Sequence, residues 1–187
     1  PFYSKMLCNR INLDVKSLEF KECLKLSARH GLTSTDDLLD LAQGRYFRWA
    51  PSDDLFAPES LACCVQGLDQ HPEAVLCYPK TTLIDAQGQV LQSYEDNLDL
   101  RQTSPVERSR AAVKQIGMTN VIYGLMRTSV LRQTRLIRSF PGADVVFVTE
   151  LALFGQFHEI DQRLFFRRMH PGAYSRIQSL EGTQALM

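Results

Sequence analysis

The stretch that decides the fold is GRYFRWAPSDDLFAP, residues 44–58. Its residues 46–50 are rich in aromatic side chains and are bounded by a glycine and a proline, which predicts a short strand. Two carboxylates, Asp53 and Asp54, follow directly. Pro58 is typical of the first turn of a helix. The stretch therefore predicts a strand, an acidic loop and a helix in succession.

The acidic pair is a candidate cation site. In open α/β sheets, ligands bind beyond the carboxyl ends of the strands, and two neighbouring carboxylates repel each other unless a cation neutralises them. Mg²⁺ or Mn²⁺ usually enters such a site through one or two carboxylates plus substrate phosphates. For an isolated Asp-Asp dipeptide, a helix-capping role for one residue and a solvated role for the other is the simpler interpretation. The sequence around Asp53 and Asp54 has to decide between these interpretations.

Composition limits the classes of protein to which the chain can belong. Its 187 residues fit one domain, and 44% apolar with 22% charged residues is ordinary for a soluble globular protein. Lys plus Arg and Asp plus Glu balance at 21 each, so no global charge attracts nucleic acid. No apolar run reaches the roughly 18 residues of a membrane span. Five cysteines without a CxxC spacing argue against a disulfide framework or a zinc site and suit a reducing cytoplasm.

The alternation of strand and helix signals predicts an α/β fold with a mixed sheet. Helices are expected over residues 16–30, 33–44, 58–70, 104–116, 128–137 and 143–154, and strands over residues 46–50, 74–78, 81–84, 90–91 and 164–166. Residues 119–126 read as a strand or a buried turn, and 93–103 as a mobile loop. Residues 143–154 are apolar on nearly all sides, so a buried strand stays open there, although Gly155 as a C-cap favours the helix.

The sequence resembles the family 2 glycosyltransferases from about residue 38 to about residue 175. Five segments carry the likeness in order: residues 44–58 as the strand, acidic metal motif and Pro-led helix; 71–88 as the following strand and hairpin; 123–127 as the approach to the acceptor side; 142–155 as the acceptor-side acidic motif and its helix; and 164–170 as the closing strand with its Arg-x-His. Each segment alone is unspecific, whereas five in the expected order are specific.

The resemblance implies a GT-A-type fold, a Rossmann-like mixed sheet flanked by helices. It implies transfer of a sugar from a nucleotide-diphosphate sugar, most often a UDP-sugar, to a hydroxyl of a glycan, a lipid or another acceptor, with inversion at the anomeric carbon. A divalent metal, Mn²⁺ or Mg²⁺, would offset the charge of the departing diphosphate. A base would take the proton of the acceptor hydroxyl.

The resemblance also assigns roles to residues on the donor side. By position, Asp54 is the metal ligand and Asp53 is a second ligand or a contact to the donor diphosphate. Arg168 would counter phosphate charge. His170 would bind the diphosphate or the metal, because a neutral imidazole is a competent ligand.

On the acceptor side, the resemblance makes Asp144 the catalytic base. The usual Glu before it is replaced by Ala143, which is a departure from the family pattern. Glu150 would share the acceptor site, although a carboxylate on a helix surface is the simpler interpretation of that residue.

The resemblance divides the chain into a divergent helical segment (1–35), a glycosyltransferase-like domain (36–176) and a tail (177–187). The chain starts at Pro1, and fewer residues precede Asp53 than in complete members of the family. We therefore expect a fragment, or a front half that has diverged and is incomplete on the nucleotide-binding side.

Three functions follow from these expectations. The first is an active glycosyltransferase in the cytoplasm, free or peripheral to a membrane. The second is a non-catalytic remnant that binds a partner or a glycan. The third, a metal-dependent phosphoesterase, is disfavoured because it needs more carboxylate or His ligands than the acidic segment offers.

Overall fold

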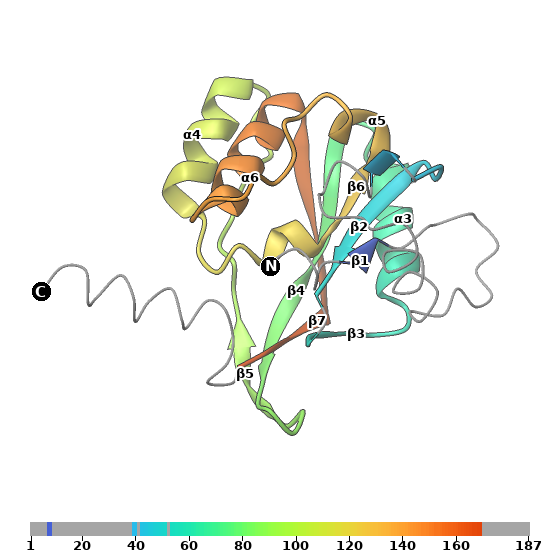
Figure 1. Ribbon diagram of the computed structural model, residues 1–187, viewed down its shortest axis with the longest axis vertical. Helices are drawn as coiled ribbons and strands as arrows, with labels where there is room; N and C mark the ends of the chain where they lie inside the picture. Colours follow the sequence, from blue (N-terminus) through green and yellow to red (C-terminus); the bar gives the residue numbers. More distant parts are fainter. Residues whose placement is uncertain (1–6, 9–38, 41, 52, 170–187) are drawn as a thin grey trace, which may run out of the picture.

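A computed structural model describes residues 7–8, 39–40, 42–51 and 53–169 of the chain (Figure 1). Its strands are β1 (Leu7–Cys8), β2 (Tyr46–Ala50), β3 (Leu55–Phe56), β4 (Ala74–Ile84), β5 (Val90–Tyr94), β6 (Leu125–Arg127) and β7 (Gln156–Arg168). Its helices are α3 (Ser60–Gln70), α4 (Pro105–Gln115), the 3-10 turn η2 (Asn120–Tyr123), α5 (Thr128–Leu131) and α6 (Ala143–Phe154).

The seven strands form one mixed sheet in the order β1-β2-β6-β4-β7-β3, with β5 paired to β4. The long strands β4 and β7 run parallel, and the other pairs are antiparallel. It follows that β2, β4 and β7 point the same way, so their carboxyl ends lie along one edge of the sheet. The prediction of an α/β fold with a mixed sheet is confirmed.

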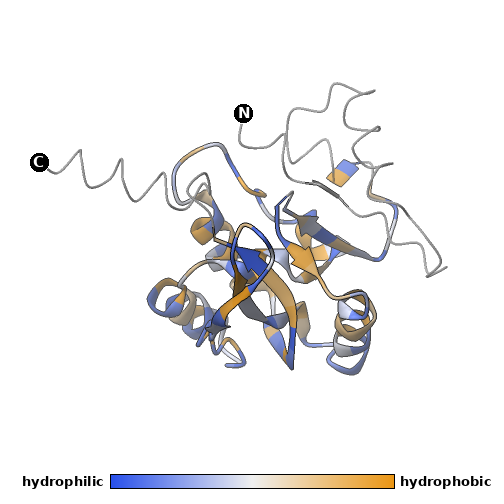
Figure 2. Cartoon of the chain, turned by 90° about the horizontal axis from the view of Figure 1, so that it is seen from below, coloured by the Kyte–Doolittle hydropathy of each residue, from blue (hydrophilic) through white to orange (hydrophobic). Residues whose placement is uncertain are grey.

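Helices cover both faces of the sheet, with α4 and α6 together on one face and α3 on the other (Figure 1). Alternate residues of the strands point to the two sides. Phe47 and Met126 therefore belong to the core under α4 and α6. Tyr46 and Leu125 belong to the core under α3. Figure 2 shows the result, with apolar strands between helices whose outer surfaces are hydrophilic.

Several local predictions are confirmed. The strand over residues 46–50 is β2. The helix opened by Ser104 is α4, where the Ser104 hydroxyl accepts the backbone N–H of Glu107. The apolar segment is the helix α6, and Gly155 is its C-cap. The region left as a strand or a turn contains both, because η2 leads into β6.

Other boundaries were wrong. The helix predicted from Pro58 begins at Ser60, after a turn. The helix predicted over residues 128–137 ends at Leu131, and the strand predicted over 164–166 is part of the 13-residue β7. Within the segment 1–35, expected to be helix and loop, Leu7–Cys8 forms a strand paired with β2.

The strand β4 runs straight through Pro79, where the sequence predicted a break. A proline has no N–H to give to a neighbouring strand. Along one side of β4, the partner changes from β6 at Leu76 and Cys77 to β5 at Thr81, so Pro79 faces the gap between them. Along the other side, the register with β7 shifts between Pro79 and Lys80. A bulge at this point lets one long strand replace the two predicted ones.

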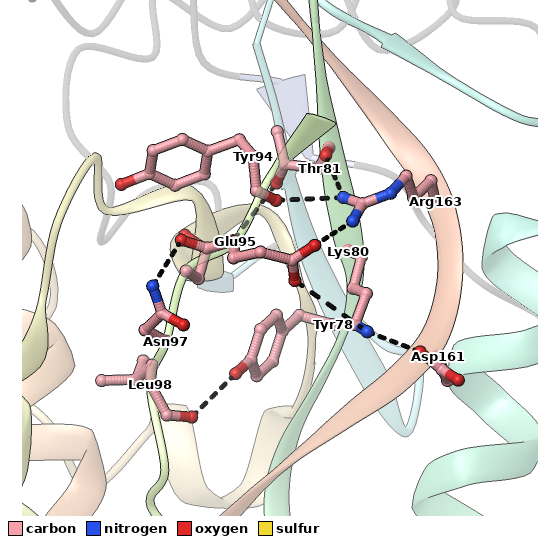
Figure 3. Close-up of polar contacts among 10 residues, drawn as sticks. Tyr78, Lys80, Thr81, Tyr94, Glu95, Asn97, Leu98, Asp161 and Arg163 are labelled. Atoms are coloured by element: carbon pink, nitrogen blue, oxygen red, sulfur yellow. Dashed lines mark hydrogen bonds and ion pairs between the residues drawn. The ribbon is translucent and has the colours of Figure 1, made fainter. Parts of the chain in front are cut away.

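The polar segment predicted as a loop over residues 93–103 continues β5 and then follows the sheet closely (Figure 3). Arg163 of β7 binds the carboxylate of Glu95 and donates to two backbone carbonyls of β4 and β5. Further along, the Tyr78 hydroxyl donates to the carbonyl of Leu98 at 3.1 Å. These contacts fix the path of the segment despite its lack of hydrophobic period.

Some predictions fall outside the described residues. The helix over residues 16–30 and the tail at 177–187 are among them. Of the helix predicted over 33–44, Leu39 and Asp40 are helical, whereas residues 42–44 are described and are not helical, so the predicted end at Gly44 was wrong.

Candidate functional site

The acidic loop lies where the sequence predicted it, between the end of β2 and the start of β3. The short strand β3 pairs with the last part of β7, with Leu55 opposite Phe166. Asp53 and Asp54 are therefore held at the edge of the sheet where β2, β4 and β7 end. This is the edge at which open α/β sheets bind ligands.

Arg168, at the end of β7, fastens the acidic loop to the β4–β5 turn. Its backbone N–H donates to Asp54 Oδ1 at 2.7 Å, and its Nε donates to the carbonyl of Asp53 at 2.8 Å. Its Nη1 donates to the carbonyls of Asp85 and Ala86, both at 2.9 Å. The guanidinium that was predicted to meet phosphate thus positions the acidic loop, and a contact to a donor diphosphate stays a prediction.

Asp54 is in an electrostatically unfavourable place for a carboxylate. Burial raises its pKa to about 6, and the charge of Asp53 adds to the rise. The hydrogen bond from the backbone of Arg168 and the nearby charges of Arg167 and Arg168 oppose it. Within the described residues, Asp54 Oδ2 has no hydrogen bond. A cation beside Asp53 and Asp54 would therefore relieve a cost that the fold leaves in place.

Tyr123, at the end of η2, is electrostatically coupled to the predicted carboxylates. Burial raises the pKa of its hydroxyl, and the negative charges of Asp54, Asp53 and Asp144 raise it further, while Arg167 opposes them. The phenol therefore stays protonated. The donor-side pair and the acceptor-side Asp144, which are some 90 residues apart in the sequence, thus act on the same hydroxyl.

An aromatic row holds Tyr123 in place. Its ring centroid is 5.4 Å from that of Phe165 in β7, and the Phe165 centroid is 5.0 Å from that of Phe56 in β3. Edge and offset contacts at these distances add to the stabilisation that ring burial gives. The row links η2 to the strand that follows the acidic loop.

Asp144 sits in the first turn of α6. The helix begins after Gly142, which has a positive φ of 77°, and Asp144 Oδ1 accepts the backbone N–H of Val145 at 2.9 Å. Ala143, which stands where the family pattern has Glu, is 5% exposed and packs in the core. A carboxylate at that position would be buried among apolar side chains, so Asp144 is the acid of this turn that reaches the site.

Arg167 is a member of the site that the sequence did not reveal. Its Nη1 donates to the carbonyl of Met118 and to Asn120 Oδ1, both at 2.6 Å. Its positive charge lowers the pKa of both Asp54 and Tyr123. Neighbouring residues of a strand point to opposite faces, so the Arg167-Arg168 pair in the sequence could not show which side chain faces the acids.

Glu150 and His170 are the two remaining predicted residues. Glu150 accepts the backbone N–H of Arg135 with both oxygens, at 3.1 and 3.2 Å, and so fixes the loop before α6. Its acceptor-side role stays a prediction. His170 lies outside the described residues.

The acids suit a metal that arrives with its substrate. Across the described ranges, no three His, Cys, Asp or Glu side chains are grouped to hold an ion by themselves. A diphosphate-bound Mg²⁺ or Mn²⁺ takes one or two carboxylates and completes its shell with phosphate oxygens and water. Asp53 and Asp54 fit that requirement, because Asp54 Oδ2 has no hydrogen bond within the part of the chain that the structure describes.

None of the helices in the described part of the chain is both long enough and apolar enough to cross a membrane.

No protein-family model matches the sequence, and no curated protein matches it. Among solved structures, the chain is similar to Staphylococcus aureus TarS 1–349, with a TM-score of 0.47 and 14% sequence identity. The match covers 71% of this chain and spans 38% of the length of that one.

Proposed function

We propose that the protein transfers a sugar from a nucleotide-diphosphate sugar to an acceptor hydroxyl. The observation that carries the proposal is the position of Asp53 and Asp54 at the carboxyl edge of the sheet, together with the effect of these two acids and Asp144 on the pKa of the Tyr123 hydroxyl. This arrangement, together with the ordered sequence resemblance, supports a donor site next to an acceptor site.

In this function, Asp54 and Asp53 would hold Mn²⁺ or Mg²⁺, which supplies charge neutralisation for the departing diphosphate. Arg167 would place a further positive charge beside the same group. The acceptor oxygen would attack the anomeric carbon while the bond to the diphosphate breaks and the diphosphate keeps the electron pair. Asp144 would take the acceptor proton, and inversion follows if the attack comes from the opposite side.

The test is the thermal stability of the protein with uridine diphosphate and MnCl₂. A ligand at a hundred times its dissociation constant stabilises the native state by about 2.7 kcal/mol. We expect a rise in melting temperature that needs both reagents and is lost in Asp54→Asn. No rise at millimolar concentrations of both would refute donor binding.

Asp96→Asn is the matched control. Asp96 has a pKa raised to about 6, as Asp54 has, chiefly by burial. Its two oxygens are both hydrogen-bonded inside the protein, to Thr81 and Asn120. Removing its charge should therefore leave the response to uridine diphosphate and Mn²⁺ unchanged.

Asp144→Asn separates catalysis from binding. This variant should keep the rise in melting temperature and lose release of uridine diphosphate from a UDP-sugar. If the wild type binds the donor and releases no uridine diphosphate with any acceptor hydroxyl, the non-catalytic binding function replaces the enzyme.

A further inference from the structure

Arg48 is a buried cation on the face of the sheet that α3 covers. Its side chain is 3% exposed. Its Nη1 donates to Ser60 Oγ at 3.2 Å and its Nη2 to Cys64 Sγ at 3.1 Å, and its guanidinium carbon lies 4.5 Å from the centroid of the Phe56 ring. Its Nε is buried without a hydrogen bond in the described part of the chain.

The partners of Arg48 leave its charge without a carboxylate among the described residues. Burial lowers the pKa of Arg48, and the sulfur of Cys64, which Arg48 contacts, opposes that effect. A buried guanidinium without a counter-charge is costly. The surroundings of Arg48 therefore favour a thiolate at the sulfur it contacts.

Cys64 of α3 and Cys77 of β4 belong to one buried cluster between the helix and the strand. Both are 0% exposed. Cys77 Sγ lies against the turn of α3 that follows Cys64. Gly67, one turn after Cys64, makes the approach possible, because a Cβ at position 67 would lie 2.6 Å from Cys77 Sγ.

The two thiols have opposite tendencies to ionise. The hydrogen bond from Cys77 and the charge of Arg48 lower the pKa of Cys64 to about 7 against the opposing effect of burial. The same hydrogen bond and burial raise the pKa of Cys77. Cys64 is thus the more readily ionised of the two thiols, and the thiolate is the nucleophilic form of a cysteine.

We propose that Cys64 and Cys77 form an oxidisable dithiol, in which Cys64 is the attacking thiolate held by Arg48 and Cys77 is the resolving thiol. With hydrogen peroxide as oxidant, the Cys64 sulfur attacks one peroxide oxygen and the O–O bond breaks. This gives a sulfenic acid and a hydroxide, which takes a proton and leaves as water. The Cys77 sulfur then attacks the Cys64 sulfur, the S–O bond breaks, and a second water leaves with the Cys77 proton. In total, two thiols are oxidised to one disulfide while one peroxide is reduced to two waters.

This site is independent of the proposed sugar transfer. Asp53, Asp54 and Asp144 take no part in it. A failure of donor binding would leave the dithiol chemistry untouched, and the reverse also holds.

The experiment exposes the whole chain to hydrogen peroxide, which is small enough to reach sulfurs that larger reagents cannot. Remaining thiols are alkylated in denaturant, and the protein is cleaved after acidic residues. Cleavage at Asp69 and Glu73 separates residues 63–64 from Cys77. We expect a reducible link between the peptides of Cys64 and Cys77 by mass. In Cys77→Ser, the sulfenic acid should persist on Cys64 and be trapped by dimedone.

Cys63→Ser is the matched control. Cys63 is the neighbour of Cys64 on α3, is less buried, and contacts Gln162 at 3.5 Å. Its removal should leave the Cys64–Cys77 link unchanged. Oxidation of Cys63 in the wild type while Cys64 and Cys77 stay alkylatable would overturn the proposal.

The pH profile tests the part that Arg48 plays. The rate of Cys64 oxidation in the wild type should rise with pH to a midpoint near 7. In Arg48→Met, we expect less than half the wild-type rate at pH 7 and a midpoint at higher pH. A wild-type midpoint at about 8.5, the value of an ordinary thiol, would refute the assignment without any variant. If Arg48→Met does not fold, Arg48→Lys keeps the charge, and the wild-type profile still decides.

Discussion

At the scale of single residues, a comparison of two aspartates shows why only Asp54 is a candidate metal ligand. Asp54 and Asp96 both have a pKa raised to about 6, mainly by burial. Asp96 gives one oxygen to the Thr81 hydroxyl and the other to the Asn120 amide. Asp54 gives Oδ1 to a backbone N–H and keeps Oδ2 without a hydrogen bond in the described residues. Burial thus raises the pKa of both carboxyl groups. At Asp96 both oxygens are used within the protein, whereas at Asp54 one oxygen is left that could bind a cation.

Asp96 makes stability depend on pH in a definite direction. Its folded pKa of about 6 lies above the unfolded value, so the folded state binds the proton more tightly. The ionised carboxylate therefore destabilises the fold above pH 6, and this cost disappears as the pH falls below about 4. Asp96→Asn should be more stable than the wild type by about 1–3 kcal/mol at pH 8 and equal to it near pH 4.

Urea unfolding of both proteins at the two pH values measures this difference. Asn keeps one acceptor and one donor for Thr81 and Asn120, so the shape of the site is retained. A variant that is less stable than the wild type at pH 8 would show that the charge of Asp96 is compensated in the folded state.

At the scale of elements, one arginine joins the acidic loop, β7 and the β4–β5 turn. Arg168 donates from its side chain to three carbonyls on two separate segments. A lysine keeps the charge and lacks the planar fork that reaches them together. Arg168→Lys should lose about 2 kcal/mol of stability, because hydrogen bonds to charged groups contribute on that order.

Hydrogen exchange would localise the loss. We expect faster exchange for the amides of residues 53–56 and 85–89, with the amides of α4 unchanged. Uniformly faster exchange would mean that Arg168 stabilises the whole fold and has no special hold on the acidic loop.

Elements specified by local signals were predicted well from the sequence. The hydroxyl of Ser104 and the missing N–H of Pro105 act within one turn, so α4 could be placed within a residue. The lengths of β4 and β7 could not be predicted, because each is defined by pairing with the other across about 70 residues. Pro79 also led to the prediction of two strands in place of one, because whether a strand tolerates a proline depends on which strand lies beside it.

The candidate site divides in the same way. The sequence resemblance proposed Asp53, Asp54 and Asp144, and the charges of all three raise the pKa of Tyr123 in the structure. The sequence could not identify Arg167 or Tyr123 as residues of the candidate site, because this depends on the face to which each side chain points. The sequence also could not predict that Arg168 holds the acidic loop. Its side chain binds backbone carbonyls, which every residue has, so no residue type indicates the contact.

At the scale of the whole molecule, the arginine side chains of the described residues donate to backbone carbonyls more often than to acids. Arg108 donates to four carbonyls, two at the end of α6 and two just before α4, and Arg127 donates to three around the end of α3. Such carbonyls have no formal charge, and these pairs are partly buried, so dissolved ions screen them little. These arginine side chains thus satisfy backbone carbonyls at helix ends and strand edges.

Stability should therefore depend weakly on salt. Between 0.05 and 1 M NaCl, we expect the free energy of unfolding to change by less than about 1 kcal/mol, the range of exposed ion pairs. Arg108→Lys should cost about 2 kcal/mol at either salt concentration. Urea titrations at both ionic strengths measure this, and a steep loss in high salt would instead point to the surface pairs such as Arg45–Asp69.

The parallel pairing of β4 with β7 also sets an order of events during translation. About 70 residues separate the end of β4 from the start of β7. At roughly 5–20 residues per second, a nascent chain carries β4 for several seconds before its central partner has been synthesised. During that time the run AVLCYPKTTLI presents an apolar edge to other chains in the cell. Pro79 and Lys80 interrupt that edge with a missing donor and a charge, and so they protect the unfinished protein from aggregation.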